Sequence, residues 1–208
     1  MIVPARSNPG RRPALVTGLL ASLLLTALAA GCTSGGRSEG GQATTPTTGA
    51  AQAQPLRIRL VATAKVPPGG LSAKRAATRA APGLEKFLDR YLTVAFVDAA
   101  GGKASWNGLL RLFDTPVRAS ARKQLDALSL GAAAPKVRAV RPHRASARAV
   151  VLFGGQRPEA ATVRLAFDAT ADTGQGSGQV HLRSVLQLLA TGEGWRIAAF
   201  DSRTGPPK

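Results

Sequence analysis

After the predicted helices of this chain, the spacing of apolar residues changes from a helical period to a period of two. Leu84, Leu88, Tyr91 and Ala95 follow the i, i+4, i+7 spacing of a helix with one apolar face. From residue 147 onward, apolar residues instead occupy alternate positions, which is typical of strands. Helices followed by a run of strands predict an α+β fold, in which helices pack on an antiparallel sheet.

The helical part of the pattern predicts three segments. The strongest covers residues 84–96 and should end at the glycine pair 101–102. A short apolar stretch at 106–113 predicts one or two helical turns. Residues 115–131 predict a third helix, with Thr115 as its N-cap and a proline in its first turn.

The alternating part predicts an antiparallel meander, because glycine-containing turns separate its segments. Its predicted strands are residues 147–153, 163–169, 180–188 and 195–199. Residues 136–141 are a candidate for a further strand. Alternation at residues 56–60 also predicts a strand ahead of all the helices.

The N-terminal 31 residues have a basic start and an uncharged continuation. Arg6, Arg11 and Arg12 come first, and residues 13–31 carry no charge. Small residues then precede Cys32, and this ending resembles the lipobox of bacterial lipoprotein signal peptides. The resemblance implies cleavage before Cys32, acylation of its thiol, for instance with palmitate, and a position on the extracytoplasmic side of the cell membrane. An uncleaved membrane anchor is the alternative, because nineteen helical residues would span about 28 Å.

Residues 33–54 contain no large apolar residue and are rich in Gly, Ser, Thr, Gln and Ala, so they predict a flexible tether. The expected organisation is a signal peptide at 1–31, the lipidated cysteine and tether at 32–54, and one α+β domain at 55–208. All nine aromatic residues fall in this last segment. A domain of that length buries about 70% of its unfolded surface, which is enough for a core.

The closing segment 194–201 reads Gly-Trp-Arg-Ile-Ala-Ala-Phe-Asp. This motif and the order of elements resemble nuclear-transport-factor-2-like (NTF2-like) domains, as found in exported lipoproteins of actinobacteria. The resemblance extends over roughly residues 83–202 and implies a curved antiparallel sheet that forms a cone, with helices across its mouth. It also implies a ligand pocket, for which the candidate lining residues are Phe87, Tyr91, Trp106 and Phe167.

His181 and Asp168 are the candidate acid–base pair. Enzymes of the NTF2-like family, such as ketosteroid isomerases and polyketide cyclases, place an Asp or His inside the cone, and these two residues could be neighbours on adjacent strands. The phase of each strand argues for the solvent-facing alternative, because His181 alternates with Val180 and Leu182. With one Cys and two His, the chain offers no Cys/His zinc site, and neither a metal nor a cofactor is predicted.

Positive charge is the most pronounced chemical feature of the composition. The chain has 28 Lys and Arg against 11 Asp and Glu, a net charge of +17. Arg164, Arg183 and Arg196 share the polar phase of the last strands and predict a basic face for an anionic lipid or wall polymer. Simple solubility is the other explanation. Nucleic acid would suit the charge but conflicts with the export signal and with an aromatic content of 4%.

Together these patterns predict a non-enzymatic, lipid-anchored binding or interaction domain of the cell envelope. Its expected partners are the membrane, through the N-terminal lipid, and either an envelope protein or an apolar ligand. Two alternatives remain open at this stage. One is an enzyme of the same cone fold that uses isomerase-like or cyclase-like acid–base chemistry. The other is an arginine-rich module that binds anionic envelope surfaces.

Overall fold

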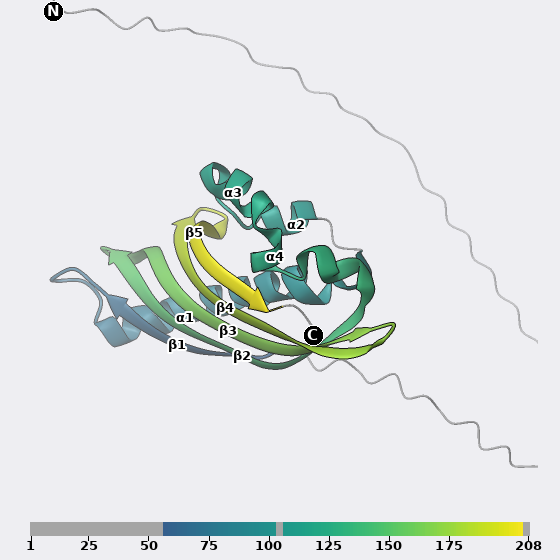
Figure 1. Cartoon of the computed structure of the whole chain (residues 1–208). Coiled ribbons are helices and arrows are strands. Elements are labelled where there is room, and N and C mark those ends of the chain that lie inside the picture. Colours follow the sequence, from purple (N-terminus) through teal and green to yellow (C-terminus); the bar gives the residue numbers. More distant parts are fainter. Residues whose placement is uncertain (1–55, 103–105, 206–208) are drawn as a thin grey trace, which may run out of the picture. The chain divides into compact units, whose positions relative to one another are not determined.

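A five-stranded mixed sheet organises residues 56–102 and 106–205, which are the residues that the computed structural model describes (Figure 1). The strands lie in the order in which they occur in the chain. They are β1 (Ile58–Lys65), β2 (Val137–Gly154), β3 (Arg157–Thr173), β4 (Gly176–Thr191) and β5 (Gly194–Gly205). The predicted signal peptide, Cys32 and the whole of the predicted tether lie outside the described residues.

The sheet is mixed because β1 pairs with β2 in parallel, whereas β2, β3, β4 and β5 form the predicted antiparallel meander. The expectation of a wholly antiparallel sheet is therefore wrong at one edge. The physical reason is the connection between β1 and β2, which contains every helix of the described residues. A crossover of that length can return the chain to the same end of the sheet, as parallel pairing requires.

The candidate strand at 136–141 and the predicted strand at 147–153 belong to one long strand, β2. An irregularity in the register between Pro142 and Arg144 divides it, and His143 lies at that point. Sequence periodicity missed the continuity because the middle of β2 has only alanines on its inner positions, Ala145 and Ala147. These alanines are buried all the same.

The first helix begins earlier than the periodicity predicts. Helix α1 (Ala73–Leu92) starts after Ser72, whose hydroxyl accepts a hydrogen bond from the backbone N–H of Arg75. A π-helical turn, η1 (Thr93–Val97), continues it. The predicted third helix is divided into shorter pieces, and Asp114 rather than Thr115 caps its start. The remaining helical segments are η2 (Ala100–Gly102), α2 (Trp106–Leu110), η3 (Thr115–Val117), α3 (Arg118–Lys123), α4 (Leu125–Leu128) and η4 (Gly131–Lys136).

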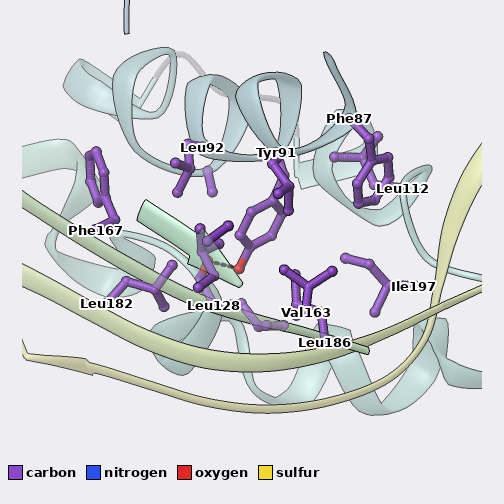
Figure 2. Close-up of a cluster of buried hydrophobic side chains, with 14 of the residues drawn as sticks. Phe87, Tyr91, Leu92, Leu112, Leu128, Val163, Phe167, Leu182, Leu186 and Ile197 are labelled. Atoms are coloured by element: carbon purple, nitrogen blue, oxygen red, sulfur yellow. Dashed lines mark hydrogen bonds between the residues drawn. The ribbon is translucent and has the colours of Figure 1, made fainter. Parts of the chain in front are cut away.

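The core lies between the helices and one face of the sheet (Figure 2). Tyr91 of α1 is fully buried there, and its hydroxyl donates a hydrogen bond of 2.9 Å to the carbonyl oxygen of Leu128. The rings of Phe96 and Phe167 join η1 to β3, with centroids 5.0 Å apart. No helix in the described part of the chain is long and apolar enough to cross a membrane.

Candidate functional site

The strand positions that point away from the core form a second face of the sheet, which we call the outer face. Strand register places these residues side by side in rows that run across the sheet from β1 to β5. The rows are Lys65–Leu152–Ala160–Leu189–Arg196, Thr63–Val150–Thr162–Gln187–Ala199, Val61–Arg148–Arg164–Val185–Asp201, Arg59–Ser146–Ala166–Arg183–Arg203 and, without β1, Arg144–Asp168–His181–Gly205.

The outer face carries every large hydrophobic side chain that is exposed among the residues of the described ranges. We call these five residues the aliphatic patch: Val61, Val150, Leu152, Val185 and Leu189. They are 36% to 55% exposed and belong to the first three rows. Exposed leucines scattered singly need no explanation, but these five side chains all lie on one face of the sheet.

The aliphatic patch was not predicted from the sequence, although a signal for it was present. Residues 149–153 are apolar at consecutive positions, and residues 185–189 are apolar at four positions of five. Such runs differ from the strict alternation of apolar and polar residues in a strand that has one face in the core and one face in solvent. Both phases of these segments therefore carry apolar side chains, and only one phase can enter a single core.

Arginines lie beside the aliphatic patch, and several of them face one another. Arg148 on β2 is opposite Arg164 on β3, and Arg183 on β4 is opposite Arg203 on β5. Within residues 56–102 and 106–205, Arg148, Arg164 and Arg203 form no ion pair with an acidic side chain. Like charges directly opposite each other on a sheet are destabilising, so this face holds positive charge that its own carboxylates do not balance.

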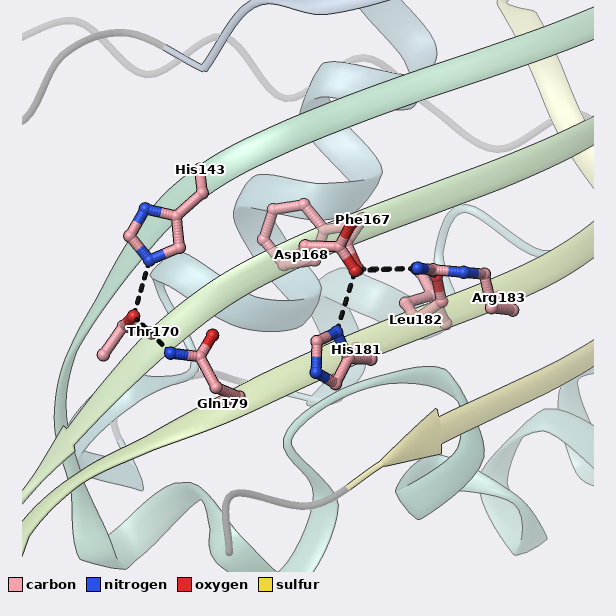
Figure 3. Close-up of polar contacts among 8 residues, drawn as sticks. All are labelled: His143, Phe167, Asp168, Thr170, Gln179, His181, Leu182 and Arg183. Carbon is pink, nitrogen blue, oxygen red and sulfur yellow. Dashed lines mark hydrogen bonds and ion pairs between the residues drawn. The ribbon is translucent and has the colours of Figure 1, made fainter.

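The predicted pair His181 and Asp168 does come together at the polar end of the outer face (Figure 3). The Nδ1 atom of His181 lies 2.8 Å from Oδ1 of Asp168, and a guanidinium nitrogen of Arg183 donates to the same oxygen at 2.8 Å. Burial alone would raise the pKa of Asp168. The hydrogen bonds and charges of His181 and Arg183 outweigh burial and hold the pKa below its usual value.

A second polar group extends this end of the outer face (Figure 3). The Nε2 atom of His143 lies 2.5 Å from the hydroxyl oxygen of Thr170, and the amide of Gln179 donates to that hydroxyl at 3.3 Å. Together with the cluster around Asp168, these residues occupy the end of the face that the aliphatic patch leaves free. Along the strands, the exposed valines and leucines thus lie toward one end of the outer face, interspersed with polar side chains, and the two polar clusters lie toward the other end.

This position does not suit general acid–base catalysis, which needs a titratable group in a pocket that can hold a substrate. The side chain of His181 is 54% exposed. Neither His181 nor Asp168 lines any of the cavities described below. In the described part of the chain, no three His, Cys, Asp or Glu side chains gather so that they could hold a metal ion.

The three arginines predicted to form a basic face are not equivalent. Arg164 and Arg183 lie on the outer face and are exposed. Arg196 is at the β5 edge, where its guanidinium donates to the carbonyl oxygen of Arg111 and pairs with Glu193 at 2.6 Å. Its side chain is only 27% exposed, so it supports the β4–β5 turn more than it faces solvent.

The four aromatic residues predicted to line a pocket also differ from one another. Phe87, Tyr91 and Phe167 are at most 7% exposed and fill the core (Figure 2). They pack between the helices and the sheet and do not line the described cavities. Trp106 is half-buried and lines a cavity of about 410 Å³ next to α3 and η4.

A larger cavity of about 1140 Å³ lies between η4 and the β3–β4 hairpin. Apolar residues, including Leu130 and Val180, form part of its wall, while Lys136 and Arg138 contribute positive charge. The glycine-rich loop 174–178, at the tip of the β3–β4 hairpin, forms another part. The sequence pattern does not predict this cavity, because its walls come mainly from two separate segments, residues 126–138 and 173–180, and neither segment is apolar as a whole.

Comparison with known proteins gives little further information. No family model matches the chain, and no curated protein matches its sequence. Among solved structures, an IcmL-like type IV secretion system protein from Legionella pneumophila subsp. pneumophila str. Philadelphia 1 shares 14% sequence identity. The match covers 67% of this chain and 98% of that protein, with a TM-score of 0.40. This similarity is too distant to support an argument about function.

Proposed function

We propose that this chain is a lipid-anchored domain on the extracytoplasmic side of a bacterial cell membrane, and that it acts by binding and not by catalysis. The anchor rests on the sequence around Cys32, the chain's only cysteine, which follows a basic start and an uncharged apolar segment. The binding role rests on the outer face of the sheet.

The aliphatic patch is the observation that carries the binding role. A sheet face that merely contacts water needs polar side chains, and here valines and leucines of β1, β2 and β4 occupy adjacent rows. An exposed apolar surface with a polar rim is characteristic of interaction sites. The flanking arginines suit the same role, because arginine is enriched where proteins bind partners.

The finer fold assignment is part of this proposal. An NTF2-like cone would explain why helices precede a meander and why the sheet bends around them (Figure 1). The Gly194-Trp195 motif at the start of β5 supports it. Strand β1 is an addition to that plan, since it joins the edge of the meander in parallel.

The anchor is tested by replacing Cys32 with serine in the native host. We expect the variant to remain an unprocessed precursor without acyl groups, because the thiol is the atom that the lipid modifies. Ser34→Ala, two residues away, is the matched control and should be processed normally. Intact mass and partition into a detergent phase report both properties. A Cys32→Ser protein with the mass and location of the wild type would overturn the anchor.

Binding of a ligand is a second candidate function, and the 1140 Å³ cavity is the observation that favours it. Its partly apolar wall suits an apolar ligand with an anionic group near Lys136 and Arg138. Native mass spectrometry of the protein recovered from its own envelope should then show an adduct of a few hundred daltons. Ala133→Trp, on the cavity wall, should abolish that adduct, whereas Ala77→Trp on α1 should not.

A further inference from the structure

We propose that the outer face of the sheet docks on the anionic lipid bilayer to which the chain is anchored. The inference deepens the proposed function, because it names the partner of the binding face, and it rests on the lipid anchor at Cys32. On this view the acyl chains hold the protein at the membrane, and the outer face sets how the domain lies on it.

The chemistry of the face suits a bilayer surface. Leu152 and Leu189 flank Ala160 in one row, and Val150 adjoins them in the next. Aliphatic side chains in such an arrangement can enter the boundary between headgroups and acyl chains. Arg148 and Arg164 lie in the row beyond, between Val61 and Val185, and a guanidinium group can bind a lipid phosphate with two hydrogen bonds.

The charge of the face favours an anionic partner over a second copy of the chain. Apart from Arg196, the basic residues in the rows are Arg59, Lys65, Arg144, Arg148, Arg164, Arg183 and Arg203. The acidic residues are Asp168, already engaged by His181 and Arg183, and Asp201. Two such faces in contact would bring unbalanced arginines together. An anionic bilayer instead contributes about 1 kcal/mol for each Lys or Arg near its surface.

The length of chain between Cys32 and β1 favours the membrane over a diffusing protein partner. If residues 33–54 behave as a flexible chain, their r.m.s. reach is about 25 Å. A domain of this size has a radius of gyration of about 15 Å and measures roughly 40 Å across. The tether is therefore shorter than the domain, and the bilayer surface stays at a high effective concentration. Even a weak affinity of the outer face would then keep it docked.

A single fluorescent label can test this, because Cys32 is the only native cysteine and its thiol would be acylated. We would introduce Leu152→Cys in the aliphatic patch or, as a matched control, Thr78→Cys on the exposed side of α1. Each variant carries a polarity-sensitive fluorophore. The full mature protein is reconstituted into vesicles of phosphatidylglycerol and phosphatidylcholine, or of phosphatidylcholine alone.

In the anionic vesicles only, we expect the emission of the fluorophore at position 152 to shift to the blue. We also expect quenchers attached to the acyl chains to reduce that emission. The fluorophore at position 78 should remain exposed to water in both kinds of vesicle. Arg148→Glu with Arg164→Glu should lower the docked fraction at position 152 by at least tenfold, because two favourable charges become repulsive. Lys74→Glu with Lys86→Glu on α1 makes the same change in net charge and should leave docking intact.

Two outcomes would overturn the docking proposal and leave the anchor standing. In the first, the anchored protein stays on the anionic vesicles, but the fluorophore at position 152 is as exposed to water as the fluorophore at position 78. In the second, the label becomes buried only when proteins from the envelope are added, which would assign the outer face to a protein partner.

Absence of acyl groups from the purified protein would instead overturn the proposed anchor. The docking proposal is then tested by adding the unlipidated chain to the same two kinds of vesicle. Flotation with anionic vesicles that is lost at high salt would support it. If the unlipidated chain floats equally with anionic and neutral vesicles, or with neither of them, the docking proposal is overturned.

Discussion

Arg148 and Arg164 lie directly opposite each other on β2 and β3, exposed on the outer face, and neither forms an ion pair with any acidic residue in the described ranges. Opposed residues on neighbouring strands have Cβ atoms about 5 Å apart, so the two guanidinium groups share one small region. Such a pair weakens the isolated domain. Its presence in the sheet, with Arg183 opposite Arg203 nearby, is most simply explained by a function that requires the charge.

We predict that Arg164→Gln stabilises the free protein by about 0.2–1 kcal/mol at low salt, because it removes one member of a repulsive cross-strand pair. The gain should shrink at high salt, where exposed charges are screened. Urea unfolding at two salt concentrations measures both effects. Lys86→Gln on α1 also removes one exposed positive charge and should leave stability nearly unchanged. A loss of stability in Arg164→Gln at low salt would contradict the prediction.

Tyr91 offers a test of the core that needs only absorbance, because it is the only tyrosine of the chain. Burial raises the pKa of its hydroxyl well above the usual value near 10. The folded protein should therefore show no tyrosinate at pH 11. Since the pKa is raised in the folded state, stability should fall as the pH rises above about 10, and tyrosinate should appear together with unfolding. Gradual ionisation of the folded protein near pH 10 would contradict the buried position.

The hydroxyl of Tyr91 is also expected to contribute to stability through its hydrogen bond to Leu128. Tyr91→Phe leaves that buried carbonyl oxygen without this donor, which should lower the free energy of unfolding by about 1–3 kcal/mol. Phe87→Leu, in the same core but without a polar atom, is the control for a change in packing alone. Denaturant unfolding of both variants gives the comparison, and an unchanged stability in Tyr91→Phe would show that water or another donor replaces the hydroxyl.

Much of the fold could be predicted because apolar periodicity responds directly to burial. The meander, the helix around Tyr91 and the first strand follow from spacing alone. The parallel pairing of β1 could not be predicted in this way, because the neighbour of an edge strand depends on the path of the intervening chain. The continuity of β2 was also hidden, since buried alanines such as Ala145 give a weak apolar signal.

The candidate site was predictable only in part. Alternation correctly indicated that His181 and Asp168 occupy the polar phase, and the register brings them into contact. The aliphatic patch was not predicted, because assigning one phase to the core led to the other phase being treated as polar throughout. Val150 and Leu152 show the error, since they alternate with buried Val151 and Phe153 and are themselves exposed.

The backbone at Gly131 supplies a further prediction. Its φ of 49° is in the left-handed region, and a Cβ there would lie 2.6 Å from the Cα of Asp126. Gly131→Ala should therefore destabilise the protein by more than the ~1 kcal/mol typical of a positive φ alone. Gly69→Ala is the matched control, because its φ of 76° is also positive but open space surrounds it. Thermal unfolding measures the stability of both variants. Equal losses of stability in Gly131→Ala and Gly69→Ala would contradict the steric argument.

The cluster around Asp168 makes a prediction about acid stability. Its pKa is lowered in the folded state, so the ionised form stabilises the fold above the unfolded pKa of about 3.9, and this contribution is lost as the pH falls through the folded pKa. Asp168→Asn should therefore cost about 0.2–1 kcal/mol at pH 6, the range of partly exposed ion pairs, and almost nothing near pH 2. Asp201→Asn, on the same face and without an ion pair among the described residues, is the control for removing a carboxylate there. Urea unfolding of the three proteins between pH 2 and pH 6 measures the difference. A penalty for Asp168→Asn that is constant across this range would mean that the residue acts through packing or neutral hydrogen bonds and not through its charge.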